Sequence, residues 1–150
     1  MTTLKIGDKA PFFEGVDQNG NMIKLSDYKG KKVVLFFYPK ASTPGCTAEA
    51  CDLQNNIDRF LTNNYQVIGV SADSQKRQLN FAFKNNLQYP LIADEDKTVI
   101  NAYGVWGPKK FMGREFDGIH RTTFIIDEKG VIENIIEKVK TKEHTNQILK

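Results

Sequence analysis

The sequence predicts an α/β fold, in which a mixed central sheet is flanked by helices and preceded by an N-terminal β-hairpin. Three observations lead to this prediction. The apolar run 33–38 is typical of a strand that is buried on both faces. A strand–helix–strand succession follows it, which requires a parallel pair with a right-handed crossover. Two more strand patterns, joined by a tight turn at 127–130, add antiparallel strands near the end.

The N-terminal part of the chain predicts the hairpin and the first core strand. Segments 12–16 and 22–25 flank a stretch that ends in an Asn-Gly pair, which favours a tight hairpin turn. A polar loop then leads into the strand at 33–38. The breaker-rich stretch 39–45 predicts a loop directly after that strand.

Helical patterns alternate with strands through the middle of the chain. From Cys46 onward apolar residues fall on one helical face, and an Asn pair at 63–64 ends the pattern. A strand at 66–70 follows, and Ser74 caps a second helix. The residues expected on the two apolar faces are Ala50, Leu53, Ile57, Phe60 and Leu61 in the first helix and Leu79, Ala82 and Phe83 in the second.

The last third of the chain completes the predicted fold. The elements expected there are a short strand within 88–93, a short helix at 96–103, a structured Gly- and aromatic-rich loop at 104–118 with room for one short strand, strands at 122–126 and 131–139, and an amphipathic helix at 141–149. This order is the thioredoxin-like plan. No repeat or linker divides the chain, so we expect residues 1–150 to form a single domain.

The composition is that of an ordinary globular protein. Hydrophobic residues make up 40% of the 150 positions and charged residues 26%. The net charge is +3 and the basic residues are dispersed, which argues against a nucleic-acid partner. No apolar run approaches the roughly 20 residues of a membrane span, and the first residues lack the apolar core of a signal peptide. We therefore expect a cytoplasmic protein with no membrane partner.

The chain contains two cysteines, Cys46 and Cys51, and two histidines, His120 and His144. Two cysteines are too few for a disulfide scaffold, and a cysteine pair in a cytosolic chain is more often catalytic or metal-binding. The histidines are 24 positions apart and the Cys-x4-Cys spacing fits a zinc finger only marginally. The pattern therefore argues against a zinc site.

Cys46 stands where a buried strand, a tight loop and the start of a helix follow one another. Ligands bind at the carboxyl ends of strands in open α/β sheets. The first turn of a helix has unpaired N–H groups and a partial positive charge, which favours the thiolate form of a cysteine. Cys46 is thus a candidate nucleophile. The alternative is a small buried hydrophobic residue, a common fate of free cysteines.

Thr43 lies three residues before Cys46, close to the same turn. Its hydroxyl can both donate and accept hydrogen bonds, so it can hold a small polar molecule against the sulfur. The alternative for Thr43 is a helix cap, and one side chain can serve both purposes.

The pattern Pro39-x3-Thr43-x2-Cys46 resembles the active-site signature of the peroxiredoxins. Cys51, five residues after Cys46, resembles the resolving cysteine of the bacterioferritin comigratory protein subfamily, also called Q-type. The resemblance covers nearly the whole chain and includes segments 7–11, 25–30, 70–73, 103–107, 111–113 and 117–127.

This resemblance implies a thiol-dependent peroxidase that reduces hydrogen peroxide or an organic hydroperoxide. Cys46 would become a sulfenic acid and would then form an intramolecular disulfide with Cys51. Thioredoxin or a glutaredoxin-like protein would return the pair to the dithiol. The resemblance implies no metal, haem or flavin. It favours a monomer, because the resolving cysteine is on the same helix and no partner subunit is required; a dimer is the alternative.

The resemblance also implies roles for other side chains. Arg121 would stabilise the thiolate and the charge that develops on the peroxide. Thr43 would hydrogen-bond the peroxide, Pro39 would shield the sulfur from bulk water, and Glu49 would orient Arg121. Without the resemblance, Arg121 would be interpreted as part of a surface salt bridge and Glu49 as a solvated helix residue.

The two histidines are expected to be non-catalytic. His120 precedes Arg121 in a predicted strand, so their side chains point to opposite faces. His144 belongs to the terminal helix, where we expect it to be solvated.

The spacing of the two cysteines has a geometric consequence. In one regular helix, residues i and i+5 have Cα atoms ~8.6 Å apart. A disulfide needs Cα atoms within about 7 Å of each other. The first turns of the helix must therefore unwind before Cys46 and Cys51 can join.

Three alternatives remain at this point. A thiol–disulfide oxidoreductase on the same fold would normally carry Cys-x2-Cys, and insulin reduction would reveal it. A metal-binding or copper-delivery module would retain stoichiometric metal after purification. An interaction protein that has lost activity is disfavoured by the intact set of Pro39, Thr43, Cys46 and Arg121.

Overall fold

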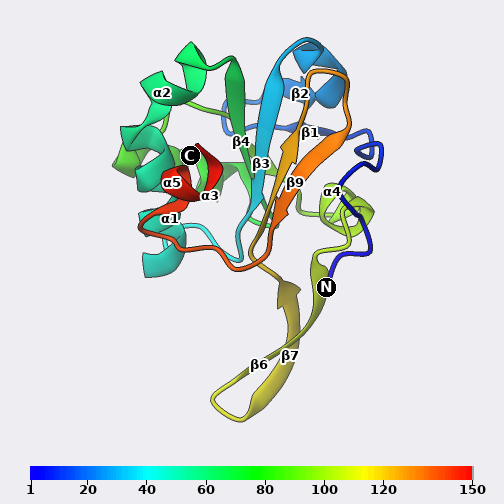
Figure 1. Cartoon of the computed structure of the whole chain (residues 1–150). Coiled ribbons are helices and arrows are strands. Elements are labelled where there is room, and N and C mark those ends of the chain that lie inside the picture. The colour runs from blue at the N-terminus through cyan, green and yellow to red at the C-terminus, as the bar shows by residue number, and fades with distance from the viewer. Residues whose placement is uncertain (150) are drawn as a thin grey trace.

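A computed structural model describes residues 1–149 and contains the predicted mixed sheet (Figure 1). In these residues the strand order is β5-β4-β3-β8-β9; β3, β4 and β5 run parallel, and β8 and β9 are antiparallel additions. The elements are β1 (Glu14–Val16), β2 (Met22–Lys24), η1 (Leu25–Tyr28), β3 (Lys32–Phe37), α1 (Pro44–Asn55), α2 (Ile57–Thr62), β4 (Tyr65–Ser71), α3 (Gln75–Asn85), β5 (Leu91–Ala93), α4 (Thr98–Ala102), β6 (Trp106–Phe111), β7 (Arg114–Ile119), β8 (Thr122–Ile126), β9 (Ile132–Ile136) and α5 (His144–Ile148).

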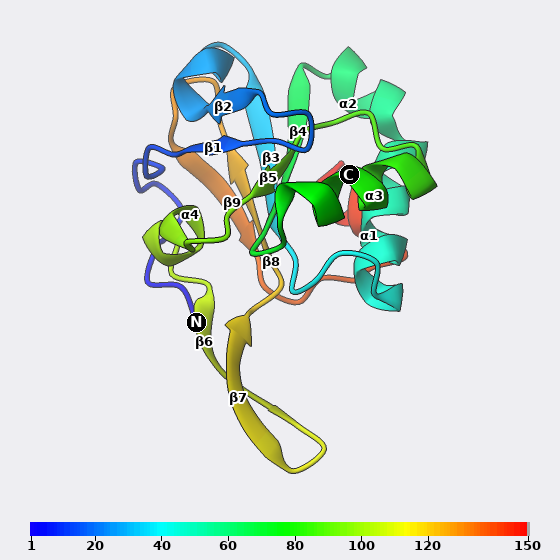
Figure 2. The same cartoon turned by 180° about the vertical axis from the view of Figure 1, so that it is seen from behind.

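The sheet is covered on both faces. Helices α1, α2, α3 and α5 lie on one side, and the β1–β2 hairpin and α4 lie on the other (Figures 1 and 2). Side chains alternate across a strand, so successive residues along β3 pack into two separate hydrophobic cores. Leu35 and Phe37 face α4, whereas Phe36 and Tyr38, the residue after β3, face α1 and α3. No helix among residues 1–149 has the length and apolar character needed to cross a membrane.

The first long helix starts earlier and ends sooner than predicted. Helix α1 begins at Pro44, two residues before Cys46, since proline is well suited to the first helical position. It ends at Asn55, because the Asn56 side-chain amide donates to the Asp52 carbonyl at 2.8 Å and competes with the helical bonding pattern. Leu61, expected on the buried face, is 56% exposed in α2, so that prediction is wrong.

The buried face of α3 also differs from the prediction. Ser74 caps the helix as expected, by accepting a hydrogen bond from the Arg77 N–H. However, Leu79 and Phe83 are exposed, and Gln78 is buried in their place. The Gln78 amide donates to the Ser71 hydroxyl and to a β5 carbonyl, both at 2.9 Å. Because these bonds satisfy the buried amide, a polar residue can occupy the core-facing position.

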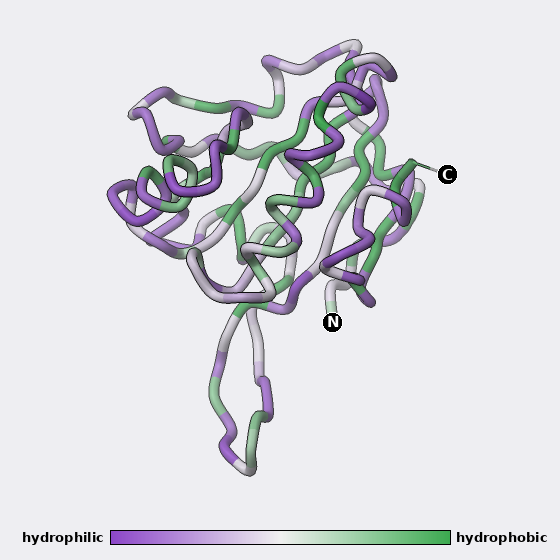
Figure 3. The backbone as a smooth tube through the Cα atoms, turned by 90° about the vertical axis from the view of Figure 1, so that its left-hand side faces the viewer, coloured by the Kyte–Doolittle hydropathy of each residue, from purple (hydrophilic) through white to green (hydrophobic). Residues whose placement is uncertain are grey.

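Residues 104–118 form more than the expected loop. Strands β6 and β7 pair in an antiparallel hairpin that projects from the body of the protein (Figures 2 and 3). Met112 and Gly113 close it with φ angles of 52° and 80°, the conformation of a tight hairpin turn. The sequence of these two strands does not alternate between apolar and polar residues, because most of the hairpin does not pack against a hydrophobic core. Strand β9 and helix α5 are each shorter than the segments 131–139 and 141–149 that were predicted for them.

Candidate active site

The site forms where β3 and β8 lie side by side. Phe37 at the end of β3 pairs with Thr122 at the start of β8. Arg121 precedes Thr122, so this register brings its side chain to the carboxyl end of β3, where α1 begins. The pairing explains how Arg121 meets Cys46 across 75 positions of sequence.

The loop between β3 and α1 is anchored to the end of β4. The Ala41 N–H donates to Asp73 Oδ2 at 2.7 Å, and the Ser71 hydroxyl donates to the same oxygen at 2.7 Å. Asp73 is buried, and sequence reasoning did not assign it to the site. The available signal was a pair of polar residues directly after an apolar strand, at the edge of the sheet where ligands bind.

Cys46 lies in the first turn of α1 and is 1% exposed. Arg121 Nη2 donates a hydrogen bond to its sulfur at 3.2 Å. Gly45 leaves room for this approach, because a β-carbon there would stand 3.3 Å from the same guanidinium nitrogen. A guanidinium in hydrogen-bond contact with a sulfur at a helix start stabilises the thiolate form.

Glu49 lies one helical turn after Cys46, on the same face of α1. Arg121 Nη1 donates to its Oε1 at 2.7 Å, so the guanidinium fork spans Glu49 and Cys46. The Glu49 side chain is fully buried. Burial raises the pKa of Glu49 from 4.5 to about 7, although the facing Arg121 works in the opposite direction. The structure thus rules out a solvated helix residue for Glu49 and an ordinary surface salt bridge for Arg121.

His144 is buried, which corrects the expectation that it is solvated. It begins α5, and this helix folds back onto α1 and β8. Its Nε2 lies 2.7 Å from the Thr123 hydroxyl and 3.4 Å from Glu49 Oε2. Sequence reasoning missed this contact because a polar residue near the chain end is usually exposed.

Thr43 and Pro39 lie in the loop that leads to Cys46. Thr43 occupies the N-cap position of α1, yet within the described residues its side chain makes no capping bond. Its hydroxyl instead donates to the Lys40 carbonyl at 2.7 Å, and the side chain is half-buried. Pro39 is half-buried directly after the strand end. Thr43 is therefore the cap residue by position, as expected, but its side chain does not cap the helix, and its hydroxyl oxygen keeps acceptor capacity.

Cys51 is half-buried near the middle of α1. Its thiol donates a long hydrogen bond of 3.5 Å to Asn85 Oδ1 on α3, and burial raises the pKa of the thiol. The next residue, Asp52, holds α5: the Thr145 N–H donates to Asp52 Oδ2 at 2.7 Å and the Thr145 hydroxyl donates to the Asp52 carbonyl at 3.2 Å. Both cysteines are free thiols in the structure.

The projecting hairpin adds a cation that sequence reasoning did not find. Lys109 of β6 is half-buried and donates to the Ile119 carbonyl at 2.9 Å. Burial lowers the pKa of Lys109, and the charge of Arg121 lowers it further. His120 Nε2, in contrast, lies 2.9 Å from the Pro108 carbonyl. His120 and Arg121 connect β7 to β8, so the prediction that they alternate within one strand is wrong.

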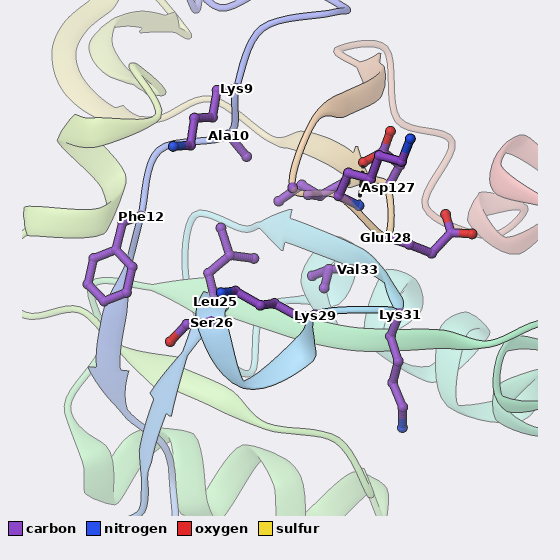
Figure 4. Close-up of a pocket in the computed structure, with 13 residues that line it drawn as sticks. Lys9, Ala10, Phe12, Leu25, Ser26, Lys29, Lys31, Val33, Asp127 and Glu128 are labelled. Carbon is purple, nitrogen blue, oxygen red and sulfur yellow. Dashed lines mark hydrogen bonds between the residues drawn. The ribbon is translucent and has the colours of Figure 1, made fainter.

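A pocket of about 330 Å³ lies at the other end of β3 (Figure 4). Its lining includes Lys31 and Val33 at the start of that strand, together with Phe12 and Lys29. The cysteines follow the opposite end of the strand, so this pocket is separate from the candidate active site.

Comparisons with known proteins agree with this geometry. The AhpC/TSA family matches residues 6–135. Peroxiredoxin Bcp of Escherichia coli is 44% identical over 149 residues, covering 99% of this chain and 96% of that protein. Peroxiredoxin Bcp of Bacillus subtilis is 45% identical over 147 residues, covering 98% and 94%.

Solved structures show the same similarity. A peroxiredoxin Q of Xanthomonas campestris superposes with a TM-score of 0.88 at 32% identity, covering 99% of this chain and 94% of that one. The peroxidoxin BcpB of Mycobacterium tuberculosis has a TM-score of 0.84 at 34% identity, covering 96% and 93%.

The thioredoxin-like fold, with a buried thiol at a helix start and an arginine against its sulfur, defines the class of the thiol-dependent peroxidases. Within this class, the chain belongs to the AhpC/TSA family, among the Bcp or Q-type peroxiredoxins.

Proposed function

We propose that the chain reduces hydrogen peroxide and organic hydroperoxides through Cys46, with Cys51 as the resolving cysteine. One observation carries this proposal: the Arg121 fork donates to the Cys46 sulfur at 3.2 Å and to Glu49 at 2.7 Å. The buried Glu49 side chain fixes one arm of the guanidinium, so the other arm is aimed at the reacting sulfur.

The first step oxidises Cys46. Its thiolate attacks the terminal peroxide oxygen, the O–O bond breaks, and a sulfenic acid forms. The second oxygen leaves as hydroxide or alkoxide and takes a proton to become water or alcohol. Arg121 stabilises the negative charge as it moves from sulfur to the leaving oxygen. Thr43 offers a hydroxyl to the peroxide, and Pro39 limits access of bulk water to the sulfur.

The second step joins the two cysteines. The Cys51 thiolate attacks the Cys46 sulfur and displaces hydroxide, which leaves as water after protonation. Both residues lie in α1, where their Cα atoms are ~8.6 Å apart in regular helical geometry. Local unwinding of α1 therefore belongs to each turnover. Identical amide-exchange protection across residues 44–55 in the reduced and oxidised protein would contradict this step.

A dithiol donor such as thioredoxin or a glutaredoxin-like protein then reduces the disulfide by exchange. The enzyme acts as a monomer, because one helix supplies both the attacked and the resolving sulfur. We place this cycle in the cytoplasm, where thiol donors are kept reduced, and assign residues 1–150 to one catalytic domain.

The test is intact-mass and non-reducing gel analysis of the reduced protein after one equivalent of hydrogen peroxide, with Cys46→Ser and Cys51→Ser variants beside it. We expect the wild type to lose two hydrogens without forming a dimer, and either substitution to prevent this loss. Thiols that stay reduced, with no peroxide consumed, would refute the peroxidase. A disulfide-linked dimer would keep the peroxidase but move the resolving step to a second chain.

A thiol–disulfide oxidoreductase on the same fold is separated by one assay. Insulin reduction without peroxide consumption would favour it, whereas peroxide consumption that depends on Cys46 favours the peroxidase. The position of Arg121 at the Cys46 sulfur supports the peroxidase. Peroxide reduction produces a negatively charged leaving oxygen that a guanidinium can stabilise, whereas disulfide exchange between thiols involves no such oxygen.

A further inference from the structure

A buried polar cluster adjoins Arg121 at Glu49, which contacts the Nη1 of the guanidinium, whereas Cys46 contacts its Nη2. The C-terminal helix α5 brings His144 into it, α1 brings Glu49, and β8 brings Thr123. Figure 1 shows α5 lying against α1 on this face of the sheet. His144 and Glu49 are both fully buried, and the mechanism given above uses only the Glu49 oxygen that faces Arg121.

The hydrogen bonds around His144 determine which ring nitrogen carries a proton. Gln147 donates its amide to the Lys138 carbonyl, and its Oε1 accepts from the Lys140 N–H, both at 2.9 Å. This orientation directs Oε1 toward His144 Nδ1 at 2.8 Å. Since Oε1 can only accept, Nδ1 carries the hydrogen, and Nε2 of the neutral ring is left as an acceptor for the Thr123 hydroxyl.

With this assignment, Glu49 Oε2 faces the lone pair of His144 Nε2. Oε2 is buried and lacks a hydrogen-bond partner among residues 1–149, and His144 Nε2 stands 3.4 Å away. Two acceptors at this separation repel each other unless a proton lies between them. The proton can belong to Nε2, as an imidazolium beside a carboxylate, or to Oε2, as a neutral acid beside a neutral ring.

The surroundings favour one shared proton over none. Burial raises the pKa of Glu49 to about 7 and lowers the pKa of His144, so it opposes a charge on either group. The titratable and charged groups that face the pair are Asp52 from α1, Arg121 from the junction before β8, and Tyr89 from the segment before β5.

We propose that His144 is a positioning residue of the peroxidase, and that the proton it shares with Glu49 sets the net charge of the pair next to Arg121. The inference rests on the proposed function. While the pair holds its proton, it is neutral as a whole, and the Arg121 charge is available to the Cys46 thiolate and the leaving oxygen. When the proton is lost, a full negative charge faces Arg121 and competes with the reacting sulfur.

The sign of the resulting pH effect follows directly. Loss of the shared proton weakens the stabilisation of negative charge at Cys46, so the rate of peroxide reduction falls as pH rises through the midpoint of the pair. His144→Leu and His144→Gln leave Glu49 without the basic nitrogen that helps it to keep a proton, so the fall moves to lower pH. Glu49→Gln is neutral at every pH and lacks the fall.

The experiment is single-turnover oxidation of Cys46 by hydrogen peroxide from pH 5.5 to 8.5, for wild type, both His144 variants, Glu49→Gln and the control His120→Asn. We expect the midpoint of the fall to drop by about one pH unit in the His144 variants. The ratio of wild-type rate to His144→Leu rate should then grow by about tenfold across the range. A ratio that is the same at every pH would reduce His144 to a packing residue and overturn the inference.

A second measurement needs no turnover. The ring-nitrogen NMR shifts of His144 should change at the midpoint seen in the rates, and Glu49→Gln should abolish that change. His120→Asn assigns the signals, because the chain contains two histidines. An unaltered His144 titration in Glu49→Gln would refute the shared proton even if the peroxidase is real. A wild type that consumes no peroxide would refute the proposed function while the imidazole titration still decides the pairing.

Discussion

Cys46 and Cys51 lie in one helix but in contrasting surroundings. Cys46 is almost fully buried, and its sulfur accepts a hydrogen bond from Arg121, which in turn is held by the buried carboxyl group of Glu49. Cys51 is half-buried, its thiol donates to a neutral amide oxygen at 3.5 Å, and burial raises its pKa. The two sulfurs therefore differ in charge environment although they are five residues apart.

In the proposed mechanism, this difference allows one helix to serve two successive steps. The folded helix prepares Cys46, because the helix start, the guanidinium and Glu49 converge only while α1 is intact. The same fold keeps Cys51 protonated and at a distance. In the proposed mechanism, unwinding of α1 removes the environment that activates Cys46 and frees Cys51 to attack, so the stability of α1 sets the order of the two steps.

The largest expected effect separates the two cysteines outright. Cys46→Ser should lower the rate of peroxide consumption by at least about a thousandfold, since it removes the nucleophile. Cys51→Ser should retain one fast turnover and stop at a Cys46 sulfenic acid. Stopped-flow peroxide assays with intact-mass detection measure both. Oxidation at Cys51 in the Cys46→Ser variant, at the wild-type rate, would invert the assignment.

The next effect concerns the cation beside Cys46. Arg121→Met should lower the rate of Cys46 oxidation by about 10²- to 10³-fold, the scale seen when one donor to a developing charge is removed. The alkylation rate of Cys51 by iodoacetamide serves as the internal control and should change little. Equal slowing of both cysteines would indicate a general loss of structure instead of a local charge effect.

Protonation of Glu49, near Cys46 in α1, should also make the free energy of unfolding depend on pH. The native Glu49 carboxyl keeps its proton to about pH 7, whereas the unfolded one loses it near its ordinary value of 4.5. The native state therefore binds more protons between these values, and the free energy of unfolding falls as pH rises through this window, by on the order of a few kcal/mol at most.

Urea unfolding of wild type and Glu49→Gln from pH 4 to 8 measures this contribution. The wild-type stability minus the variant stability should decrease between pH 4.5 and 7. His144 contributes with the opposite sign, because burial lowers its pKa, so the same comparison is also made with His144→Leu present in both proteins. A difference that is flat with pH would contradict the raised pKa of Glu49.

A smaller effect tests the space beside Arg121. Gly45→Ala places a β-carbon 3.3 Å from Nη2, so the guanidinium must shift by a few tenths of an ångström. We expect Cys46 oxidation to slow by roughly two- to fivefold. Thermal stability should hold or rise by up to about 1 kcal/mol, since alanine favours the helix. Loss of stability together with activity would point to a disturbed helix start instead.

The smallest effect concerns Cys51. Asn85→Ala removes its hydrogen-bond acceptor, a contact of 3.5 Å that contributes less than about 1 kcal/mol. Disulfide formation after Cys46 oxidation should speed up by about twofold, with Cys46 oxidation unchanged. Asn80→Ala on the exposed face of the same helix is the matched control. A slower disulfide step would mean that Asn85 guides Cys51 instead of restraining it.

The parts of the site that are local in sequence could be predicted. The stretch from Pro39 to Cys46 combines a strand end, a breaker-rich loop and a helix start, and each has its own residue signature. The strands of the central sheet were equally clear because their apolar runs are buried on both faces. Arg121 could be assigned by resemblance alone, since its contact with Cys46 depends on strand pairing.

The remaining parts depend on tertiary contacts that residue types do not reveal. His144 and Gln78 are polar side chains that occupy buried positions only because distant groups satisfy them. The β6–β7 hairpin lies mostly off the core, so it shows no apolar alternation to identify its strands. The end of α1 at Asn55 follows from a side-chain bond that competes with the backbone.

The bonds between Asp52 and Thr145 connect the position of α5 to the oxidation state of the two cysteines. Asp52 directly follows Cys51, so a helix that unwinds to bring Cys51 to Cys46 also withdraws the two Asp52 acceptors that bond Thr145 of α5. Asn146 projects from α5 into solvent. A fluorescent label at that position would report the thiol or disulfide state of two sulfurs that it never touches, which makes the short last helix a natural starting point for a peroxide biosensor.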